Sequence, residues 1–275
     1  MNLDRYFARL GYTGPATATL ATLHALAIAQ PHAIAFENIA VAAGGVPDIT
    51  LPAVAAKLLD EGRGGYCYEQ NTLLQAALRA IGFQVTAHLA RVRYQQPPDH
   101  VNERGHMLLR VDLPEGRFIV DAGFGGVTLT APLALVCDRP QPTAHETMRF
   151  IAVGDEYRLQ AQFGGDWADV YQFGLDPQLP ADIVPQNWYT ATRPSAMFRN
   201  NVIATRPARG GRHALFNQTL TWRPVGGTPQ RRPVIGAAAL GEVLGDIFAL
   251  QIPESEIIRA ADVAAAAPAT ARSFG

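Results

Sequence analysis

The sequence has little charge of either sign and no long apolar run. Its 275 residues carry 23 lysines and arginines against 24 aspartates and glutamates, a formal net charge of −1. Nucleic-acid binding needs a basic face that neutralises phosphates, and this balance argues against it. No stretch of about 18 apolar residues occurs, so we expect no membrane-spanning helix. The first five residues lack the charged-then-apolar order of a secretory signal, which favours a cytoplasmic protein.

Cysteine is scarce as well, because the chain has only Cys67 and Cys137. Without a secretory signal, two free thiols are expected rather than a disulfide. No histidine has metal-ligand spacing with a cysteine, so we expect no metal site. Neither a dinucleotide fingerprint nor a Walker loop occurs, so no tightly bound cofactor is expected. The histidines interpreted as structural are His24, His32, His88, His100, His145 and His213.

Positive charge is concentrated only in the last third of the chain. The arginines concerned are Arg206, Arg209, Arg212, Arg231 and Arg232. Side chains of this kind are usually solvated loop residues, and this interpretation is favoured over an anion site.

Apolar residues make up 48% of the chain, enough for one large domain or for two to three smaller ones that share cores. The first 84 residues have a helical pattern. An alanine- and leucine-rich run predicts a helix from Ala16 to Gln30, ended by Pro31. Thr50 is placed as the N-cap of a second helix. A third begins near Cys67 and ends at Gly82, a typical C-terminal cap.

From about residue 83 the apolar period changes to two. Strands are predicted at 85–89, 106–112, 117–121, 148–153 and 157–162, and frequent Gly and Pro indicate a β-barrel or a strongly curved sheet. After about residue 185 the pattern is mixed. It has strand-like segments at 202–205 and 213–216 and an amphipathic helix from Ala237 to Phe248. The alanine-rich residues 260–275 are expected to be poorly ordered.

The segment Arg63-Gly64-Gly65-Tyr66-Cys67-Tyr68-Glu69 places a cysteine after two glycines, in the first turn of a predicted helix. Glycines let the backbone turn sharply and approach a ligand closely. The helix dipole and the unpaired N–H groups of that turn favour a thiolate. The segment therefore predicts that Cys67 is a nucleophile. The alternative is an ordinary core cysteine.

A cysteine nucleophile needs a base and a group that orients the base. If Leu113 and Gly116 flank a two-residue turn, Asp121 lies opposite Leu108, and His106 lies two residues along on the same face. Such diagonal neighbours are about 7–8 Å apart at the backbone, within side-chain reach. A turn longer by one residue would put them on opposite faces. Alone, His106 is equally compatible with a core histidine and Asp121 with a turn former.

The next residues, Ala122-Gly123-Phe124-Gly125-Gly126, form a glycine-rich segment. Such a segment presents backbone N–H groups to an oxyanion or a phosphate. By itself it specifies no ligand.

These segments together resemble the signature segments of the arylamine N-acetyltransferase family, over roughly residues 4 to 250. The matching stretches are 36–38 (Phe-Glu-Asn), 63–69, 105–109 (Gly-His-Met-Leu-Leu), 121–125 (Asp-Ala-Gly-Phe-Gly), 126–133 and 194–198.

The resemblance implies an α+β multidomain fold with a papain- or transglutaminase-like Cys-His-Asp core. Its parts would be an N-terminal helical bundle (1–84), a central β-barrel (85–187) and a C-terminal α/β lid (188–275). The implied residue roles are as follows: catalytic Cys67, His106 and Asp121; acceptor-binding Phe36, Val92, Phe124 and Phe198; CoA or oxyanion contacts at Tyr68, Gly123, Gly125 and Gly126; and structural support from Glu37 with Arg63, and from Glu69.

The resemblance also implies a reaction. Acetyl-CoA, as co-substrate, would acetylate Cys67, and a small aromatic amine or hydrazine would then take the acetyl group. A transglutaminase-like or peptidase-type thiol hydrolase, or an amide synthase acting on another thioester, would use the same triad. A non-catalytic binding module that keeps the fold is a third alternative.

Overall fold

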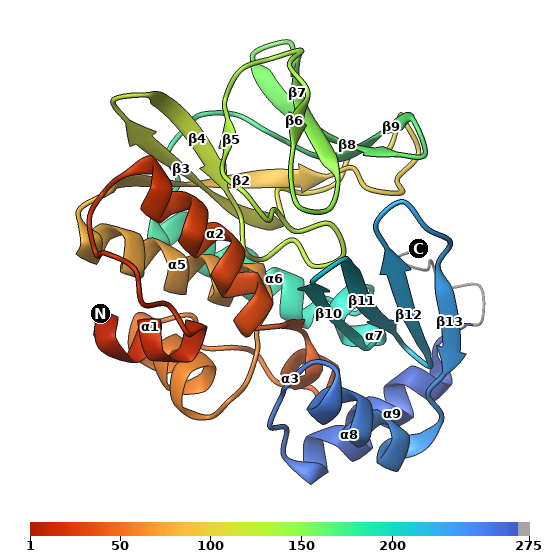
Figure 1. Cartoon of the computed structure of the whole chain (residues 1–275). Coiled ribbons are helices and arrows are strands. Elements are labelled where there is room, and N and C mark those ends of the chain that lie inside the picture. The colour runs from red at the N-terminus through yellow and green to blue at the C-terminus, as the bar shows by residue number, and fades with distance from the viewer. Residues whose placement is uncertain (269–275) are drawn as a thin grey trace.

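Helices form the first part of the chain and pack on one face of an antiparallel sheet (Figure 1). The structure is a computed structural model that describes residues 1–268. The N-terminal elements are α1 (Leu3–Leu10), α2 (Leu20–Ala33), β1 (Phe36–Glu37), α3 (Ile39–Ala42), α4 (Leu51–Ala55), the π-helical turn η1 (Ala56–Asp60) and α5 (Cys67–Ile81). The cysteine helix α5 packs against strands β2 and β3 of the sheet.

Helix α2 differs from the predicted span at both ends. It begins at Leu20 because the Thr19 side chain accepts a hydrogen bond from the Thr22 backbone N–H and caps the helix there. It also continues past Pro31 to Ala33, so the predicted end was wrong. Proline removes one N–H donor, so the helix continues past Pro31 with one backbone hydrogen bond fewer.

The other predicted N-terminal helices begin where expected. Thr50 precedes α4 as predicted, although its hydroxyl makes no capping hydrogen bond in the described chain. Helix α5 begins at Cys67 and ends at Gly82, whose φ of 108° lies in the left-handed region that glycine adopts at little cost.

The central strands form one curved antiparallel sheet in the order β5-β4-β3-β2-β9-β8-β7-β6, a nearly closed barrel. The strands are β2 (Gln84–Val92), β3 (His106–Leu113), β4 (Gly116–Val120), β5 (Leu133–Ala134), β6 (Gln141–Pro142), β7 (Thr147–Val153), β8 (Glu156–Phe163) and β9 (Asp166–Phe173). Leu113 pairs with Gly116 and Leu109 with Val120, so the predicted two-residue turn and its register are confirmed.

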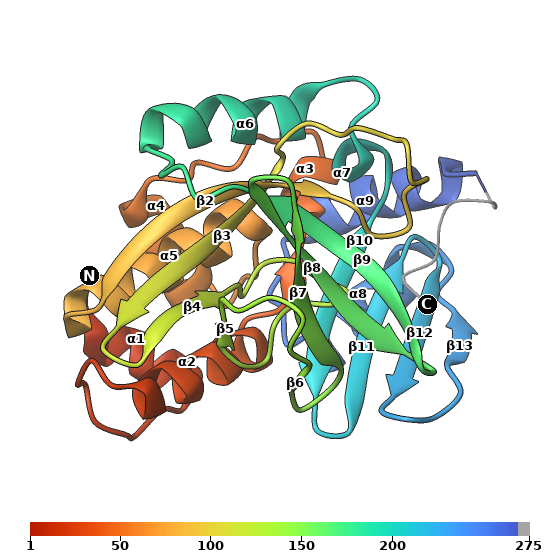
Figure 2. The same cartoon turned by 90° about the horizontal axis from the view of Figure 1, so that it is seen from above.

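The last part of the chain holds a second antiparallel sheet, in the order β1-β10-β11-β12-β13. Its elements are α6 (Pro180–Thr192), α7 (Met197–Asn200), β10 (Ile203–Ala208), β11 (Gly211–Phe216), β12 (Thr219–Pro224), β13 (Gln230–Pro233), α8 (Gly236–Asp246) and α9 (Glu254–Ala266). Figure 2 separates the two sheets, with β2–β4 over α5 on one side and β10–β13 on the other.

The alanine-rich end of the chain is partly helical, which corrects the expectation of poor order from residue 260. Ala260 and Ala264 of α9 are buried in the core that α8, α9 and the second sheet share. Small side chains suit this close contact between helices. Residues 269–275 lie outside the described part of the chain. The division at residues 84 and 187 stays a prediction, and α6 crosses the second of these positions.

Apolar side chains gather in three places: between the N-terminal helices and β2–β4, inside the barrel, and between the second sheet and α8–α9. Among residues 1–268, no helix has the length and apolar character needed to cross a membrane.

Candidate active site

Cys67 is the first residue of α5 and is 3% exposed. The backbone around it is crowded, because a Cβ on Gly123 would lie 2.5 Å from the Cys67 Cα. A Cβ on Gly64 would lie 2.2 Å from the Ala35 carbonyl oxygen. Gly64 therefore permits close packing against the backbone at Ala35, and Gly123 permits close packing against the backbone at Cys67.

The β3–β4 hairpin brings His106 and Asp121 together beside Cys67. His106 Nε2 lies 2.7 Å from Asp121 Oδ2, and both side chains are almost fully buried. Burial works to lower the pKa of His106, but the Asp121 carboxylate and the Cys67 sulfur outweigh it and raise this pKa to about 10. The ring is therefore held as a strong base next to the thiol.

Asn71 fixes the carboxylate and was given no role by the sequence. Its Nδ2 donates to Asp121 Oδ1 at 3.0 Å and to the Met107 carbonyl oxygen at 2.7 Å. Its Oδ1 accepts from the Ala122 backbone N–H at 3.1 Å. Asn71 stands one helical turn after Cys67 and ties the cysteine helix to the hairpin. The available indication in the sequence was an amide four residues after Cys67, on the same face of the predicted helix.

Tyr171 of β9 is a second residue that the sequence did not single out. Its ring centroid lies 5.1 Å from that of His106 and 5.4 Å from that of Phe124. Burial, followed by the charge of Asp121, raises the pKa of Tyr171 well above its usual value. Its buried hydroxyl faces Asp121 without a hydrogen bond of standard geometry. The ring covers the triad from the barrel side.

A small apolar cavity of about 120 Å³ opens over the triad. Its lining residues are Phe36, Cys67, Val92, Tyr94, Gln95, Gln96, Gly105, His106, Gly123, Phe124, Met197 and Phe198. The four predicted acceptor contacts, Phe36, Val92, Phe124 and Phe198, therefore face the same space as the sulfur. The Phe124 ring stands edge-on to His106, with the centroids 5.1 Å apart.

The predicted CoA or oxyanion group is only partly brought together, because of its members only Gly123 lines this cavity. Tyr68 does not line it, and its hydroxyl donates to the Gly105 carbonyl oxygen at 2.9 Å. Gly125 packs against Phe36, and the Gly126 carbonyl accepts from Arg223.

The predicted support residues belong to a buried charge cluster. Arg63 contacts Glu37 at 3.3 Å, as the sequence predicted, and also Glu256 of α9 at 3.0 Å. Lys57 contacts Glu69 at 2.6 Å and Glu37 at 3.7 Å. Burial works to raise the pKa of Glu37, but Lys57 and Arg63 outweigh it and lower this pKa. The cluster lies beneath the start of α5.

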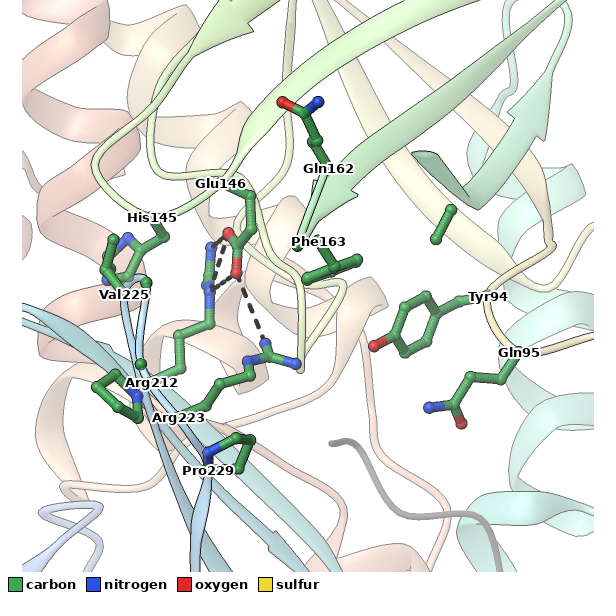
Figure 3. A pocket seen from close by; sticks show the side chains of 15 residues that line it. Tyr94, Gln95, His145, Glu146, Gln162, Phe163, Arg212, Arg223, Val225 and Pro229 are labelled. Atoms are coloured by element: carbon green, nitrogen blue, oxygen red, sulfur yellow. Dashed lines mark hydrogen bonds and ion pairs between the residues drawn. The ribbon is translucent and has the colours of Figure 1, made fainter. Parts of the chain in front are cut away.

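A second, larger cavity of about 600 Å³ lies between the barrel and the β12–β13 hairpin (Figure 3). It shares Tyr94 and Gln95 with the small cavity. Glu146 accepts hydrogen bonds from Arg212, at distances down to 2.6 Å, and also contacts Arg223. These charged side chains form one wall of the cavity (Figure 3).

The expectation that the C-terminal arginines are all solvated loop residues was wrong for two of them. Arg212 is 3% exposed, and Arg206 donates from Nε to the His32 carbonyl oxygen at 2.7 Å. Pairing with a residue distant in sequence, as Arg212 pairs with Glu146, allows a charge to be buried. Across residues 1–268, no group of three His, Cys, Asp or Glu side chains is placed to hold a metal ion.

Comparisons with known proteins agree with this geometry. A family model described as N-acetyltransferase matches residues 19–257. The chain is 35% identical to the arylamine N-acetyltransferase of Escherichia coli (strain K12) over 92% of this chain and 90% of that protein. It is 36% identical to the enzyme of the same name from Mycolicibacterium smegmatis, over 84% and 86%.

Solved structures give the same result. Mycobacterium marinum arylamine N-acetyltransferase superposes with a TM-score of 0.92 at 33% identity, covering 96% of this chain and all of that one. The same enzyme in complex with CoA gives a TM-score of 0.91 at 34% identity, covering 95% and 99%. The family model, the relatives and the shared fold together show that the chain belongs to the arylamine N-acetyltransferase family of acyltransferases.

Proposed function

We propose that the protein transfers an acetyl group from acetyl-CoA to aromatic amines and hydrazines through an acetyl-cysteine intermediate on Cys67. One observation carries the proposal: a cysteine at a helix N-terminus shares an apolar cavity with a histidine that Asp121 holds at 2.7 Å. The family membership supports the reaction class, and the CoA complex of a relative supports the donor.

In the first half-reaction, His106 takes the proton of the Cys67 thiol and the thiolate attacks the thioester carbonyl carbon of acetyl-CoA. The backbone N–H groups of Cys67 and Tyr68 are in the first turn of α5, which lacks intrahelical acceptors, and they are placed to receive the oxyanion. The C–S bond to CoA then breaks. The CoA thiolate leaves with the proton from His106, and Cys67 keeps the acetyl group.

In the second half-reaction, the amine nitrogen attacks the acetyl carbon and His106 takes the proton that the nitrogen loses. The Cys67 sulfur leaves, and the amide is released. Exchange of one thioester for another is nearly balanced, whereas amide formation is favourable and drives turnover.

The larger cavity is the proposed place for the nucleotide part of the donor. Tyr94 and Gln95 line both this cavity and the small one, so the two cavities adjoin. The guanidinium groups of Arg212 and Arg223 also line the larger cavity. Guanidinium groups suit phosphate recognition. Against this stands Glu146, which neutralises one of the two charges, so the wall carries a net charge of about +1.

The acetyl-cysteine is tested by intact mass after mixing with acetyl-CoA alone. One acetyl group mapping to Cys67 is expected, with none on Cys67→Ala. Acetylation at Cys137 would refute the assignment. An acetyl group that water removes as fast without amine as with it would instead identify a thiol hydrolase.

The aromatic preference is tested by single-turnover deacetylation of the acetylated protein. An aniline gains about 0.5–1.5 kcal/mol for each good ring contact in this cavity. An alkylamine arrives as an ammonium ion that must lose its water and its proton. Aniline is expected to react faster by orders of magnitude, and Phe124→Ala to reduce that preference. Equal rates for an aniline and an alkylamine of similar size would exclude the cavity as the source of selectivity.

A further inference from the structure

A π-helical turn, η1, stands just before the cysteine segment and carries a lysine inward. In this turn the Glu61 backbone N–H donates to the Ala56 carbonyl oxygen five residues back, at 3.0 Å. Turns of this kind inside helices are uncommon and often lie at functional sites. Here the turn leaves the Lys57 side chain only 17% exposed. Neither the sequence signatures nor the mechanism above gives this lysine a role.

Lys57 reaches the residue that caps the cysteine helix. Its Nζ lies 2.6 Å from Glu69 Oε1. The other oxygen, Glu69 Oε2, accepts from the Tyr66 backbone N–H at 3.1 Å and thereby closes the first turn of α5, where Cys67 stands. Gly65 leaves space for this carboxylate, since a Cβ there would lie 2.7 Å from Glu69 Oε2. The contact thus links η1 to the backbone on both sides of the sulfur-bearing residue.

The surrounding charges leave Lys57 as the cation for Glu69. Arg63 is shared between Glu37 of β1 and Glu256 of α9. In the described chain, no salt bridge to Glu69 other than that of Lys57 is formed. Glu69 is 1% exposed. Without Lys57, an almost fully buried negative charge would remain in the first turn of α5, two residues along the chain from Cys67, and an uncompensated buried charge disfavours a second charge of the same sign nearby.

Both partners show the effect of this pairing. Burial works to lower the pKa of Lys57, but Glu37 and Glu69 outweigh it, so the lysine stays charged. Burial raises the pKa of Glu69 above its usual value, even though Lys57 opposes the shift. Lys57 therefore favours the charged form of Glu69.

We propose that Lys57 is a positioning residue for the Cys67 thiolate. It keeps Glu69 in place as the cap of the cysteine helix and cancels the charge of that carboxylate in the turn that carries Cys67. This inference rests on the proposed role of Cys67 as the nucleophile. The charge of the Lys57–Glu69 pair then sets how readily the thiolate forms: zero in the wild type, −1 after loss of the lysine, and +1 after loss of the carboxylate.

The test is the rate of Cys67 alkylation by iodoacetamide against pH, followed by intact mass, in the full chain. Lys57→Met should move the profile to higher pH by about one unit, a tenfold lower rate on the acid side. Glu69→Gln keeps a capping oxygen and should move it to lower pH. The double variant Lys57→Met/Glu69→Gln and the conservative Lys57→Arg, both with a pair charge of zero, should return to the wild-type profile.

The matched control is Arg5→Met, which breaks the exposed Arg5–Asp60 pair at the other end of the same π-helical turn. Its profile should equal that of the wild type.

If Lys57 and Glu69 had only a structural role, alkylation would be slower in every variant, and the pH profiles of Lys57→Met and Glu69→Gln would not shift in opposite directions. Lys57→Met with an unchanged profile, or a double variant no better than Lys57→Met, would overturn the inference. If Lys57→Met fails to fold, the shift of Glu69→Gln to lower pH decides. A wild type that alkylates at Cys67 but takes no acetyl group from acetyl-CoA would refute the proposed function alone.

Discussion

Two histidine sites in this molecule carry the same imidazole in opposite protonation states. At the triad, His106 is paired with Asp121 and its pKa is raised to about 10. At the junction of α2, the barrel and the β10–β11 hairpin, His32 and His145 lie with ring centroids 5.9 Å apart. Burial, then His145, Arg212 and Arg206, lower the pKa of His32 to about 4. Burial acts in the same direction at both sites, so the sign of the neighbouring charge decides the difference.

At the junction, the neutral His145 ring is a fixed hydrogen-bonding group. His145 Nε2 lies 3.0 Å from the Ala208 carbonyl oxygen and 2.9 Å from that of Gly211, so it carries the proton and donates. His145 Nδ1 then accepts from the Thr130 hydroxyl at 3.2 Å. A protonated ring would lose that acceptor. The triad needs a ring that exchanges a proton, whereas the junction needs one that does not.

The largest expected effect comes from removing the anion of the triad. Asp121→Asn keeps the shape but leaves His106 without the charge that raises its pKa, so acetylation of Cys67 should slow by about 10⁴-fold. Single-turnover mass measurement with acetyl-CoA records it. His32→Gln, which alters a junction ring that lines neither cavity, is the control and should acetylate within a few-fold of the wild type. Equal losses of acetylation rate in the two variants would contradict the different roles of the triad histidine and the junction histidine.

At the junction, the corresponding change is Glu146→Gln. Arg212 is 3% exposed and depends on Glu146 for its compensating charge, and it also donates to the Thr128 carbonyl oxygen. An uncompensated buried charge should lower the free energy of unfolding by about 3–5 kcal/mol. Urea denaturation measures it. Asp60→Asn breaks an exposed pair and should cost less than about 0.5 kcal/mol. A similarly small loss in Glu146→Gln would mean that solvent screens Arg212.

The third comparison concerns how the free energy of unfolding changes with pH below 7, where His32 of the junction titrates. The folded pKa of His32, about 4, lies below its ordinary value of 6.5. The unfolded chain therefore binds the proton first, and stability is full above pH 6.5 and falls as pH drops towards 4. Because His32 is only half-buried, we expect about 1–2 kcal/mol rather than the unscreened value.

His32→Gln should flatten this fall when urea denaturation is compared at pH 7 and pH 4.5. The exposed His100→Gln is the control and should keep the wild-type slope. The carboxylates contribute equally to the pH dependence of all three proteins. The difference in slope between the wild type and His32→Gln therefore reports the contribution of His32 alone. A slope in His32→Gln that matches the wild type would place the acid sensitivity elsewhere.

The smallest expected effect is that of Thr130→Val. Thr130 is 3% exposed, and the change leaves His145 Nδ1 without its donor while keeping the side-chain volume. A buried acceptor left unpaired should cost about 1 kcal/mol. Urea denaturation at pH 7 measures it, with Thr17→Val at an exposed position as the control. No loss would show that water replaces the hydroxyl.

Local chemistry made part of this structure predictable. Cys67 at the start of α5, Gly82 at its end and the Leu113–Gly116 turn each depend on neighbours within a few residues. The family resemblance supplied the fold and the apolar residues that line the small cavity. The role it implies for Tyr68 stays a prediction, and the side-chain hydroxyl of this residue is bound to the Gly105 carbonyl.

The features that the sequence did not give depend on partners far along the chain. Asn71 meets Asp121, and Arg212 meets Glu146, across 50 and 66 residues. A polar residue reveals such a partner only when the fold has brought both into the interior. The end of α2 past Pro31 was missed for a different reason, since a proline disfavours a helix without always ending it.

The small volume over Cys67 has a consequence for inhibition. A space of about 120 Å³ leaves little room for the thiol end of CoA and an aromatic ring at the same time. On the proposed assignment, each substrate is therefore a dead-end ligand for the other half-reaction. Free CoA should compete with the amine for the acetylated protein. The steady-state rate should pass through a maximum as amine concentration rises, because amine bound to the unacetylated form keeps the donor out.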